Sequence, residues 1–466
     1  MTDPQFALAA TERASAGPRR LAQPLKQLLD GLSTPGRPVE SVWLTVVDPH
    51  GRLKGKRYSR AHFESTHAFD MCGYLMASDG RNNPLPTVRG WDAGYPDMTV
   101  LPDAESIAVM PAHRRVAHLF AQALDAAGDP LAVDPHTILD RQLRRLSQLG
   151  LHAKIGLETE FVLFHGTRED LHRSGYRSPR PAFARNLDYS ADPPPAVHSY
   201  IGTLSRALTA SGHPVEAIKC EGAPGQLEIT FPYGDPLNAC RQHLRMQMAA
   251  MRLAERARMT ASFMAAPDTG VGSGFHVHLS LWKSDDPVFA EPDGDEAGTD
   301  LLEQAIGGLL QVLPEMAPLY APTVNSYRRY QDDSFAPTHF NWGNDNRTCA
   351  VRVIGEGASR HLEIRLPGAD SNPFLTVAAV IAGIVHGLTH GTKPPQAVTG
   401  NGYADPSPIV PGSLDDALQR FEAGQAAHDA LGGDVVTHYT ALGRATSSDH
   451  ARRVTDTDRE MWFSRA

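Results

Sequence analysis

The stretch IGLETEFVLF, residues Ile155–Phe164, combines apolar residues with two carboxylates at alternate positions. This two-residue period predicts a β-strand on which Glu158 and Glu160 share one face, with Leu157 and Thr159 on the other. If the shared face is turned to solvent, the pair has no further meaning. If it is turned inward, each carboxylate raises the pKa of the other, and only a nearby cation keeps both ionised.

The composition is typical of a globular protein large enough for a catalytic domain and a smaller one, with 466 residues, 41% hydrophobic and 21% charged. A formal net charge of −9 argues against nucleic-acid or membrane partners and favours a small-molecule substrate. The four scattered cysteines and the lack of a signal-peptide core predict a cytoplasmic protein. The longest apolar run, Pro373–Leu388, is predicted to be a buried helix.

The pattern of turns and hydrophobic periods divides the chain into three parts. Residues 1–35 are expected to be a tail and a helix, and residues 36–115 a small sheet domain with a turn at Asp48–Gly51. Residues 116–466 are expected to form the catalytic domain.

Helices are predicted in the catalytic part wherever apolar residues recur at helical spacing. They include Val116–Ala127, Leu237–Phe263 and Leu414–Leu431. The final TDTDREMWFSRA, residues 455–466, is expected to form a helix that packs back on its own domain.

Two later segments repeat the alternation of the opening stretch. The segment EGAPGQLEI supplies Glu221 and Glu228, the latter on a predicted strand. The segment GSGFHVHLS places His276, His278 and Ser280 on one strand face. A single buried histidine is usually only hydrogen-bonded, but two at this spacing beside a Gly-Ser-Gly turn are typical of ligands as often as of core residues.

A third segment brings acid and base to one surface. HLEIRLP places His361, Glu363 and Arg365 on one face of a predicted strand. Three further arginines lie on or near strands, namely Arg329, Arg347 and Arg352. One interpretation is a row of cross-strand salt bridges.

The conjunction of five glutamates and a histidine favours a divalent metal site. Carboxylate oxygens suit Mg²⁺ or Mn²⁺, and an imidazole is compatible with Mn²⁺. Arginine forks match phosphate and carboxylate oxygens, so metals on one side and arginines on the other predict a nucleoside triphosphate and a carboxylate substrate. The chain lacks a GxxxxGK[ST] motif, which disfavours a P-loop fold.

Six ordered motifs resemble the signature set of the glutamine synthetase family. They are GLETEF, EGAPGQLE, GSGFHVHLS, NSYRRY, NRTCAVRV and HLEIRLPGADSNPFL. The resemblance runs from about Val39 to the C-terminus and includes VVDPHGRLKGKR and PDMTVLPD in the first domain. Only the N-terminal tail lies outside it.

The resemblance implies two or more Mg²⁺ or Mn²⁺ ions per subunit and ATP as co-substrate. The metal near the carboxylate substrate matches Glu160, Glu221 and Glu228, and the metal at the nucleotide phosphates matches Glu158, His276 and Glu363. The glutamate site matches Gly272, Arg329 and Arg365, and the ATP site matches His278, Ser280, Arg352 and His361, with Arg347 at the transferred phosphoryl group.

The resemblance also implies fold, reaction and assembly. The expected fold class is α+β, with a small N-terminal β-grasp-like domain and a catalytic domain whose curved antiparallel sheet is flanked by helices. The reaction activates the γ-carboxylate of glutamate as an acyl phosphate, which a nitrogen nucleophile attacks; metals and Arg347 offset the charge on the transferring group. The expected assembly is a dodecamer of two hexameric rings, in which the first domain of one subunit closes its neighbour's site.

One departure from the family pattern concerns the nucleophile. Ammonia-using members carry a glutamate six residues after the position of Arg329, and this chain has Phe335 there. A phenyl ring cannot bind or deprotonate ammonium, so we expect an organic amine, as in the γ-glutamyl amine ligases acting on polyamines or small monoamines such as ethanolamine. The alternative is that Phe335 only packs the flap while Asp332 or Asp333 takes the role of the glutamate.

Three other positions have weaker matches. His361 stands with Arg360 where the family usually has two arginines, so a phosphate contact there requires a protonated imidazole. Asp79, in ASDGRNNPLP, is a candidate base at the amine pocket beside Phe335. Tyr403 falls near a regulatory tyrosine of some bacterial members, but its flanking pattern differs and no modification is predicted.

These observations leave three possible functions for the protein. The favoured one is an ATP-dependent glutamate–amine ligase. The second is an ammonia-using glutamine synthetase, and the third is a non-catalytic nucleotide-binding assembly protein of the same fold.

Overall fold

The structure is a computed structural model that describes most of the chain. The described residues are 19–33, 38–66, 68–87, 93–113, 115–289 and 299–465. The expected N-terminal tail lies mostly outside them, and the helix expected after it is present as α2 (Arg19–Leu32).

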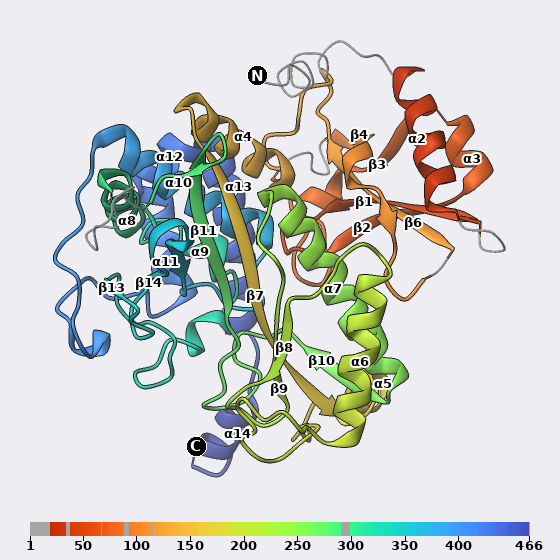
Figure 1. Cartoon of the computed structure of the whole chain (residues 1–466). Helices are drawn as coiled ribbons and strands as arrows, with labels where there is room; N and C mark the ends of the chain where they lie inside the picture. The colour runs from red at the N-terminus through yellow and green to blue at the C-terminus, as the bar shows by residue number, and fades with distance from the viewer. Residues whose placement is uncertain are drawn as a thin grey trace.

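The first sheet belongs to the N-terminal part and has the strand order β2-β1-β6-β4-β3, with β5 paired to β6. Its strands are β1 (Ser41–Val47), β2 (Leu53–Ser59), β3 (Phe69–Cys72), β4 (Asp97–Pro102), β5 (Ala108–Val109) and β6 (Val116–Ala123). Helices α2 and α3 (Arg60–Ser65) lie beside it at the upper right of Figure 1. The turn predicted at Asp48–Gly51 joins β1 to β2, as expected.

The helix predicted over Val116–Ala127 is wrong, because these residues form β6, the strand between β1 and β4. All but one residue of β6 is buried. A strand buried on both faces lacks the alternation that would mark it in a sequence, and a short apolar run fits a helix equally well. The first sheet therefore extends eight residues past the boundary predicted at residue 115.

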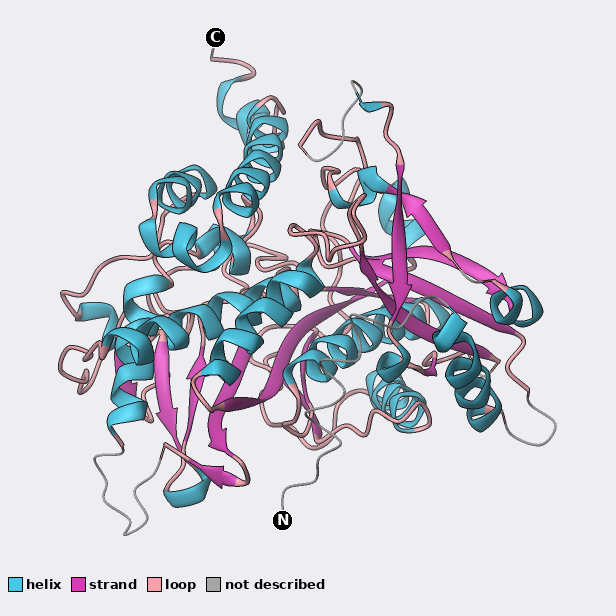
Figure 2. Cartoon of the chain, turned by 90° about the horizontal axis from the view of Figure 1, so that it is seen from above, coloured by secondary structure: helices cyan, strands magenta, loops and turns pink. Residues whose placement is uncertain are grey.

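The second sheet organises the rest of the chain, in the order β13-β14-β15-β11-β7-β9-β8 with β10 and β12 paired to β7 and β11. Its strands are β7 (His152–His165), β8 (Ala217–Cys220), β9 (Gln226–Thr230), β10 (Met259–Ser262), β11 (Phe275–Lys283), β12 (Asp286–Pro287), β13 (Trp342–Asn344), β14 (Val351–Ile354) and β15 (His361–Ile364). Only β13 and β14 pair in parallel among its described strands. The sheet curves strongly around the long β7 and β11 (Figures 1 and 2), which confirms the expected α+β fold class.

Helices lie to either side of the long strands β7 and β11 as seen in Figure 1. They are α4 (Pro135–Gln148), α5 (Arg168–Arg173), α6 (Pro195–Thr209), α7 (Pro236–Arg256), α8 (Asp300–Val312), α9 (Ala317–Tyr320), α10 (Pro373–His390), α11 (Leu414–Ala423), α12 (Gln425–Leu431), α13 (Gly433–Ala451) and α14 (Asp456–Trp462). Helix α7 packs on the apolar face of β7, where His243 contacts Thr159. Short 3₁₀ turns are η1 (Gly73–Met76), η3 (Ala104–Ser106), η4 (Ser326–Arg328), η5 (Gly357–Ser359) and η6 (Gly402–Ala404). Among the described helices, α10 alone is long and apolar enough to span a membrane, but 78% of it is buried within the protein, as predicted for a core helix.

Three of the predicted helices differ from the structure. The long helix expected to reach Phe263 ends at Arg256, and Arg258 adopts a left-handed backbone (φ 55°) before β10 begins. The helix expected over Leu414–Leu431 is two helices that meet at Gly424. The C-terminal α14 buries none of its residues within this chain, so the expectation that it packs back on its own domain is wrong.

Two arginines of α7 link this helix to the N-terminal part of the chain. Arg245 donates a hydrogen bond from Nε to His118 Nδ1 at 3.1 Å and another to the carbonyl of Ser106, while Arg241 forms an ion pair with Asp103. One continuous hydrophobic core runs from the first sheet through α10 to the C-terminal helices. The first sheet is thereby held against α7, which in turn packs on β7 and β10 of the second sheet.

Candidate active site

The register of the second sheet brings the predicted ligands together. On the central strand β7, Glu158 lies opposite His276 of β11, and Glu160 lies opposite Glu228 of β9. The opposite face of β7 is buried, as the alternation predicted. The two carboxylates of β7 are themselves partly buried, with the Glu158 side chain 19% exposed, and each belongs to a separate cluster.

We call Glu158, His276 and Glu363, the residues expected to hold the metal at the nucleotide phosphates, the second triplet. One ligand atom of each of these residues lies within 4.8 Å of the others. His276 Nδ1 lies 2.7 Å from a Glu158 oxygen and 3.4 Å from a Glu363 oxygen. Glu363 is also paired with two arginines, Arg352 at 2.9 Å and Arg365. Burial raises the pKa of Glu363, but Arg365 and His276 outweigh it and lower the pKa to about 2.

In the first triplet, Glu160, Glu221 and Glu228, one ligand atom of each residue likewise lies within 4.8 Å of the others. Glu160 accepts hydrogen bonds from Gln226 Nε2 at 2.9 Å and from the backbone N–H of Gly274 at 2.8 Å. Burial and the neighbouring Glu158 carboxylate raise the pKa of Glu228 well above its ordinary value. The positive charge of the described protein groups is therefore too small to keep the Glu228 carboxyl ionised.

Both triplets have the chemistry of a divalent cation site. Three carboxylates, or two carboxylates and an imidazole, are donors that suit Mg²⁺ or Mn²⁺. A divalent ion would also relieve the repulsion that raises the pKa of Glu228. The residues present thus fit the two metals expected from the sequence, grouped as expected, and their role as ligands remains a prediction.

The residues expected to bind glutamate lie side by side next to the triplets. Arg329 is buried and donates to the carbonyls of Leu366 at 3.0 Å and Arg365 at 3.2 Å. A Cβ atom at Gly272 would come within 3.1 Å of Arg329 Cγ, so glycine leaves room for this side chain. Arg365 also donates to the carbonyl of Arg347 at 3.1 Å.

The residues expected to bind ATP are spread along one edge of the site. His278 Nδ1 lies 3.1 Å from His361 Nε2, and Ser280 Oγ accepts a hydrogen bond from Trp282 Nε1 at 2.9 Å. Burial lowers the pKa of His361, so the imidazole is uncharged at neutral pH and a phosphate contact through protonated His361 is disfavoured. Arg347 is exposed and lines a hollow of about 430 Å³ together with residues 344–346 and 397–400.

The flap residue Phe335 is 62% exposed and adopts a left-handed backbone (φ 59°). Its carbonyl lies 3.4 Å from Arg365 Nη2, so the flap begins beside the expected glutamate site. The ring does not serve to pack the flap against the chain. Of the two alternative candidates, Asp332 and Asp333, both exposed, Asp332 accepts a hydrogen bond from Thr338 at 2.9 Å.

The second expected pocket residue, Asp79, lies in the first domain. Its carboxylate accepts hydrogen bonds from the backbone N–H groups of Arg81 and Asn83 at 2.8 Å each. Burial raises the pKa of Asp79, but the hydrogen bonds from Asn83 outweigh it and the net shift is downward. Within one chain, these contacts hold Asp79 in its own loop and make it a weak base.

Two residues near the first triplet were not predicted from the sequence. Lys219, on β8, lies opposite Glu228 in the sheet and contacts Glu221. Tyr189 places its ring 4.6 Å from Lys219 Nζ. The signal for Lys219 was its two-residue spacing from Glu221, which puts both side chains on one side of an extended segment.

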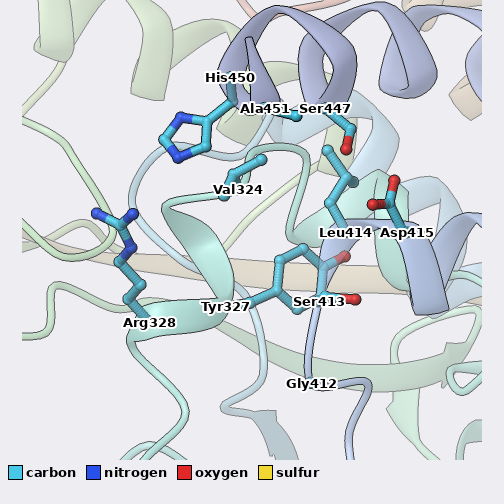
Figure 3. Close-up of a pocket in the computed structure, with 10 residues that line it drawn as sticks. All are labelled: Val324, Tyr327, Arg328, Gly412, Ser413, Leu414, Asp415, Ser447, His450 and Ala451. Atoms are coloured by element: carbon cyan, nitrogen blue, oxygen red, sulfur yellow. The ribbon is translucent and has the colours of Figure 1, made fainter. Parts of the chain in front are cut away.

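A further hollow, of about 330 Å³, lies beside η4 (Figure 3). It is lined by Tyr327, Arg328, the start of α11 at Ser413 and the end of α13 at His450. None of the expected site residues is among the described residues that line it. It is therefore separate from the carboxylate clusters.

Comparison with known proteins identifies the architecture. The sequence profile of the glutamine synthetase catalytic domain matches residues 132–462. The chain belongs to the glutamine synthetase family. Within this family, it is 36% identical over 433 residues to γ-glutamylethanolamide synthetase GlnA4 of Streptomyces coelicolor, covering 92% of this chain and 93% of the relative.

The chain is also similar to two other γ-glutamyl amine ligases and to a solved structure. A glutamate–isopropylamine ligase of Pseudomonas is 29% identical, with 87% and 90% of the two chains covered, and γ-glutamylputrescine synthetase PuuA of Escherichia coli is 29% identical, with 90% and 91% covered. The solved structure titled GmaS/ADP complex superposes with a TM-score of 0.80 at 25% identity, covering 91% of this chain and 97% of that one. The resemblance inferred from the six motifs is confirmed, as is its placement with the γ-glutamyl amine ligases.

Proposed function

We propose that this protein is an ATP-dependent ligase that joins the γ-carboxylate of glutamate to an organic amine through a γ-glutamyl phosphate. Three relatives named as ligases of glutamate with ethanolamine, isopropylamine or putrescine support the reaction class. The amine is proposed to be a polyamine or a small monoamine such as ethanolamine, and the reaction is proposed to occur in the cytoplasm.

The proposed chemistry assigns each part of the site a task. Phosphorylation of glutamate converts a poor electrophile into an acyl phosphate with a good leaving group. When bound in the two triplets, Mg²⁺ or Mn²⁺ would supply positive charge toward the phosphate and carboxylate oxygens. Arg329 and Arg365 would orient glutamate, and Arg347 would stabilise charge on the transferring phosphoryl group. Ligands fixed on strands of one sheet favour this pre-organisation.

The observation that carries an amine in preference to ammonia is the exposed phenyl ring of Phe335 beside the expected glutamate site. A ring in this place offers an apolar surface to the alkyl part of an amine. It also offers no negative charge to ammonium, which a glutamate would.

The test is phosphate release with ATP, Mg²⁺ and glutamate, comparing ammonia, ethanolamine, putrescine and spermine. We expect release to depend on glutamate and an amine, with at least about tenfold higher kcat/KM for one organic amine than for ammonia, a difference of about 1.4 kcal/mol in transition-state binding. Phe335→Glu is expected to raise kcat/KM for ammonia about tenfold and to lower it for the amine. Phe335→Gln is the matched control, because glutamine has the size of glutamate without its charge. This variant should not gain ammonia activity.

Other outcomes would support the alternatives. One alternative is glutamine synthetase, the name of a Thermus thermophilus relative that is 30% identical over 425 residues. Ammonia as the best substrate of the wild-type protein would favour this alternative. An ordered protein that binds nucleotide without phosphate release on any amine would favour a non-catalytic role. No gain of ammonia activity in Phe335→Glu would contradict the assignment of this residue.

We also propose the dodecameric assembly expected from the family, with the Asp79 loop of one subunit reaching its neighbour's site. Trp462, at the end of α14, and Phe463, directly after it, are exposed, and α14 buries none of its residues within this chain, which supports an assembly larger than a monomer. Light scattering at several concentrations measures the mass, and a monomer at all of them would contradict the proposal.

A further inference from the structure

We propose that Lys219 is the resident counter-cation of the first triplet and that its ammonium withdraws onto the ring of Tyr189 when a divalent ion enters. Lys219 is therefore a positioning residue that sets the affinity of this metal site. The inference rests on the metal sites of the proposed function, and it concerns a residue with no role in that proposal.

The contacts of Lys219 place its ammonium inside the carboxylate cluster. Its Nζ atom contacts a Glu221 oxygen and lies 3.5 Å from a Glu228 oxygen. The strand register fixes this arrangement, because Lys219 of β8 pairs directly with Glu228 of β9. One ammonium thus bridges two of the three expected ligands.

A divalent ion and this ammonium cannot both keep these positions. The same carboxylate oxygens would have to serve both cations, and two like charges at such distances repel strongly in a partly buried site. The four-carbon stem of lysine is flexible, unlike a guanidinium held by several hydrogen bonds. The lysine is therefore the part that can move.

The neighbouring ring of Tyr189 offers a place for the displaced charge. Lys219 Nζ already lies 4.6 Å from the ring centroid, within the range of a cation–π interaction. Tyr189 is 70% exposed, so an ammonium resting on its ring also remains hydrated. The movement needs only a rotation of the lysine side chain and no change in the sheet.

The test is a Mn²⁺ titration of the full-length protein by electron paramagnetic resonance, with Glu221→Gln used to assign the first site. Lys219→Met is expected to bind Mn²⁺ at the first triplet about tenfold more tightly than wild type, with affinity at the second triplet unchanged. Tyr189→Leu is expected to weaken first-site binding two- to threefold. The melting temperature of Lys219→Met should fall in EDTA and return to the wild-type value with Mn²⁺.

The matched control is Lys393→Met. Lys393 also bridges two carboxylates, Asp300 and Glu303, at 2.6 Å each, but on the surface, and its removal should leave both Mn²⁺ affinities unchanged. Unchanged or weaker first-site binding in Lys219→Met would overturn the inference. This result is separable from the proposed function, because Mn²⁺ binding is measured without ATP, glutamate or amine and the ligase assay is read by phosphate release.

Discussion

The two triplets occupy adjacent positions on one sheet, yet they balance their negative charge differently. The second triplet is paired with two guanidinium groups, Arg352 and Arg365, both buried and both directed at Glu363. The first triplet has one ammonium, from Lys219, whose side chain is partly exposed. The pKa shifts follow this difference, since that of Glu363 is lowered and that of Glu228 is raised.

The difference teaches how much of each site exists before metal binds. Arginines keep their charge and have rigid planar forks, so the second triplet is pre-organised in the metal-free protein. The first triplet is held by a mobile cation that can exchange. We therefore expect the metal-free protein to have one completed site and one site that is completed by its metal.

The largest expected effect is the loss of stability in Glu363→Gln. This change leaves the buried Arg352 and Arg365 without their carboxylate, and breaking a buried pair from one side costs about 3–5 kcal/mol. Urea unfolding in EDTA measures the free energy of unfolding. Ligase activity should be lost as well, and a stability within about 1 kcal/mol of wild type would contradict a pre-organised second triplet.

The matched change in the first triplet, Glu228→Gln, is expected to have the opposite sign. The unfolded carboxyl titrates near the ordinary value of 4.5, whereas burial and Glu158 raise the folded-state pKa of Glu228. The folded state therefore binds more protons above pH 4.5, and the contribution of Glu228 to stability is lost as pH rises toward the folded pKa. In EDTA, wild type should lose about 1.4 kcal/mol per pH unit relative to Glu228→Gln between pH 7 and 9, because burial raises the folded-state pKa to about 11.

Saturating Mn²⁺ provides the control for Glu228→Gln. It should stabilise wild type more than the variant and reverse the order of the two melting temperatures, because the ion binds the ionised carboxylate. A difference that does not change with pH in EDTA would show that Glu228 is ionised without metal.

The smallest effect is expected for Asp345→Asn. Asp345 also pairs with Arg352, but its side chain is 79% exposed, and exposed pairs contribute about 0–1 kcal/mol. The free energy of unfolding should change by less than about 1 kcal/mol, with second-site Mn²⁺ affinity unchanged. A loss as large as that of Glu363→Gln would mean that the exposed partner, not the buried one, holds Arg352 in place.

The sequence by itself determined the strands that carry the site and the face that each residue occupies. Alternation in IGLETEF, GFHVHLS and HLEIRLP predicted that Glu158, His276 and Glu363 each lie on the polar face of a strand, because side-chain direction in a strand depends only on position along it. Whether that face is turned inward was left open by the alternation. The ordered motifs predicted the family, and the comparisons confirm it.

Only the tertiary structure decided which charges neutralise which triplet. Strand register across the sheet sets Lys219 opposite Glu228 and Arg352 opposite Glu363, and such pairing joins segments that local pattern cannot match. The same reason explains the error at β6, whose identity as a strand comes from its neighbours on both sides. Periodicity is local and readable along the chain, whereas counter-ions and burial arise from contacts between distant segments.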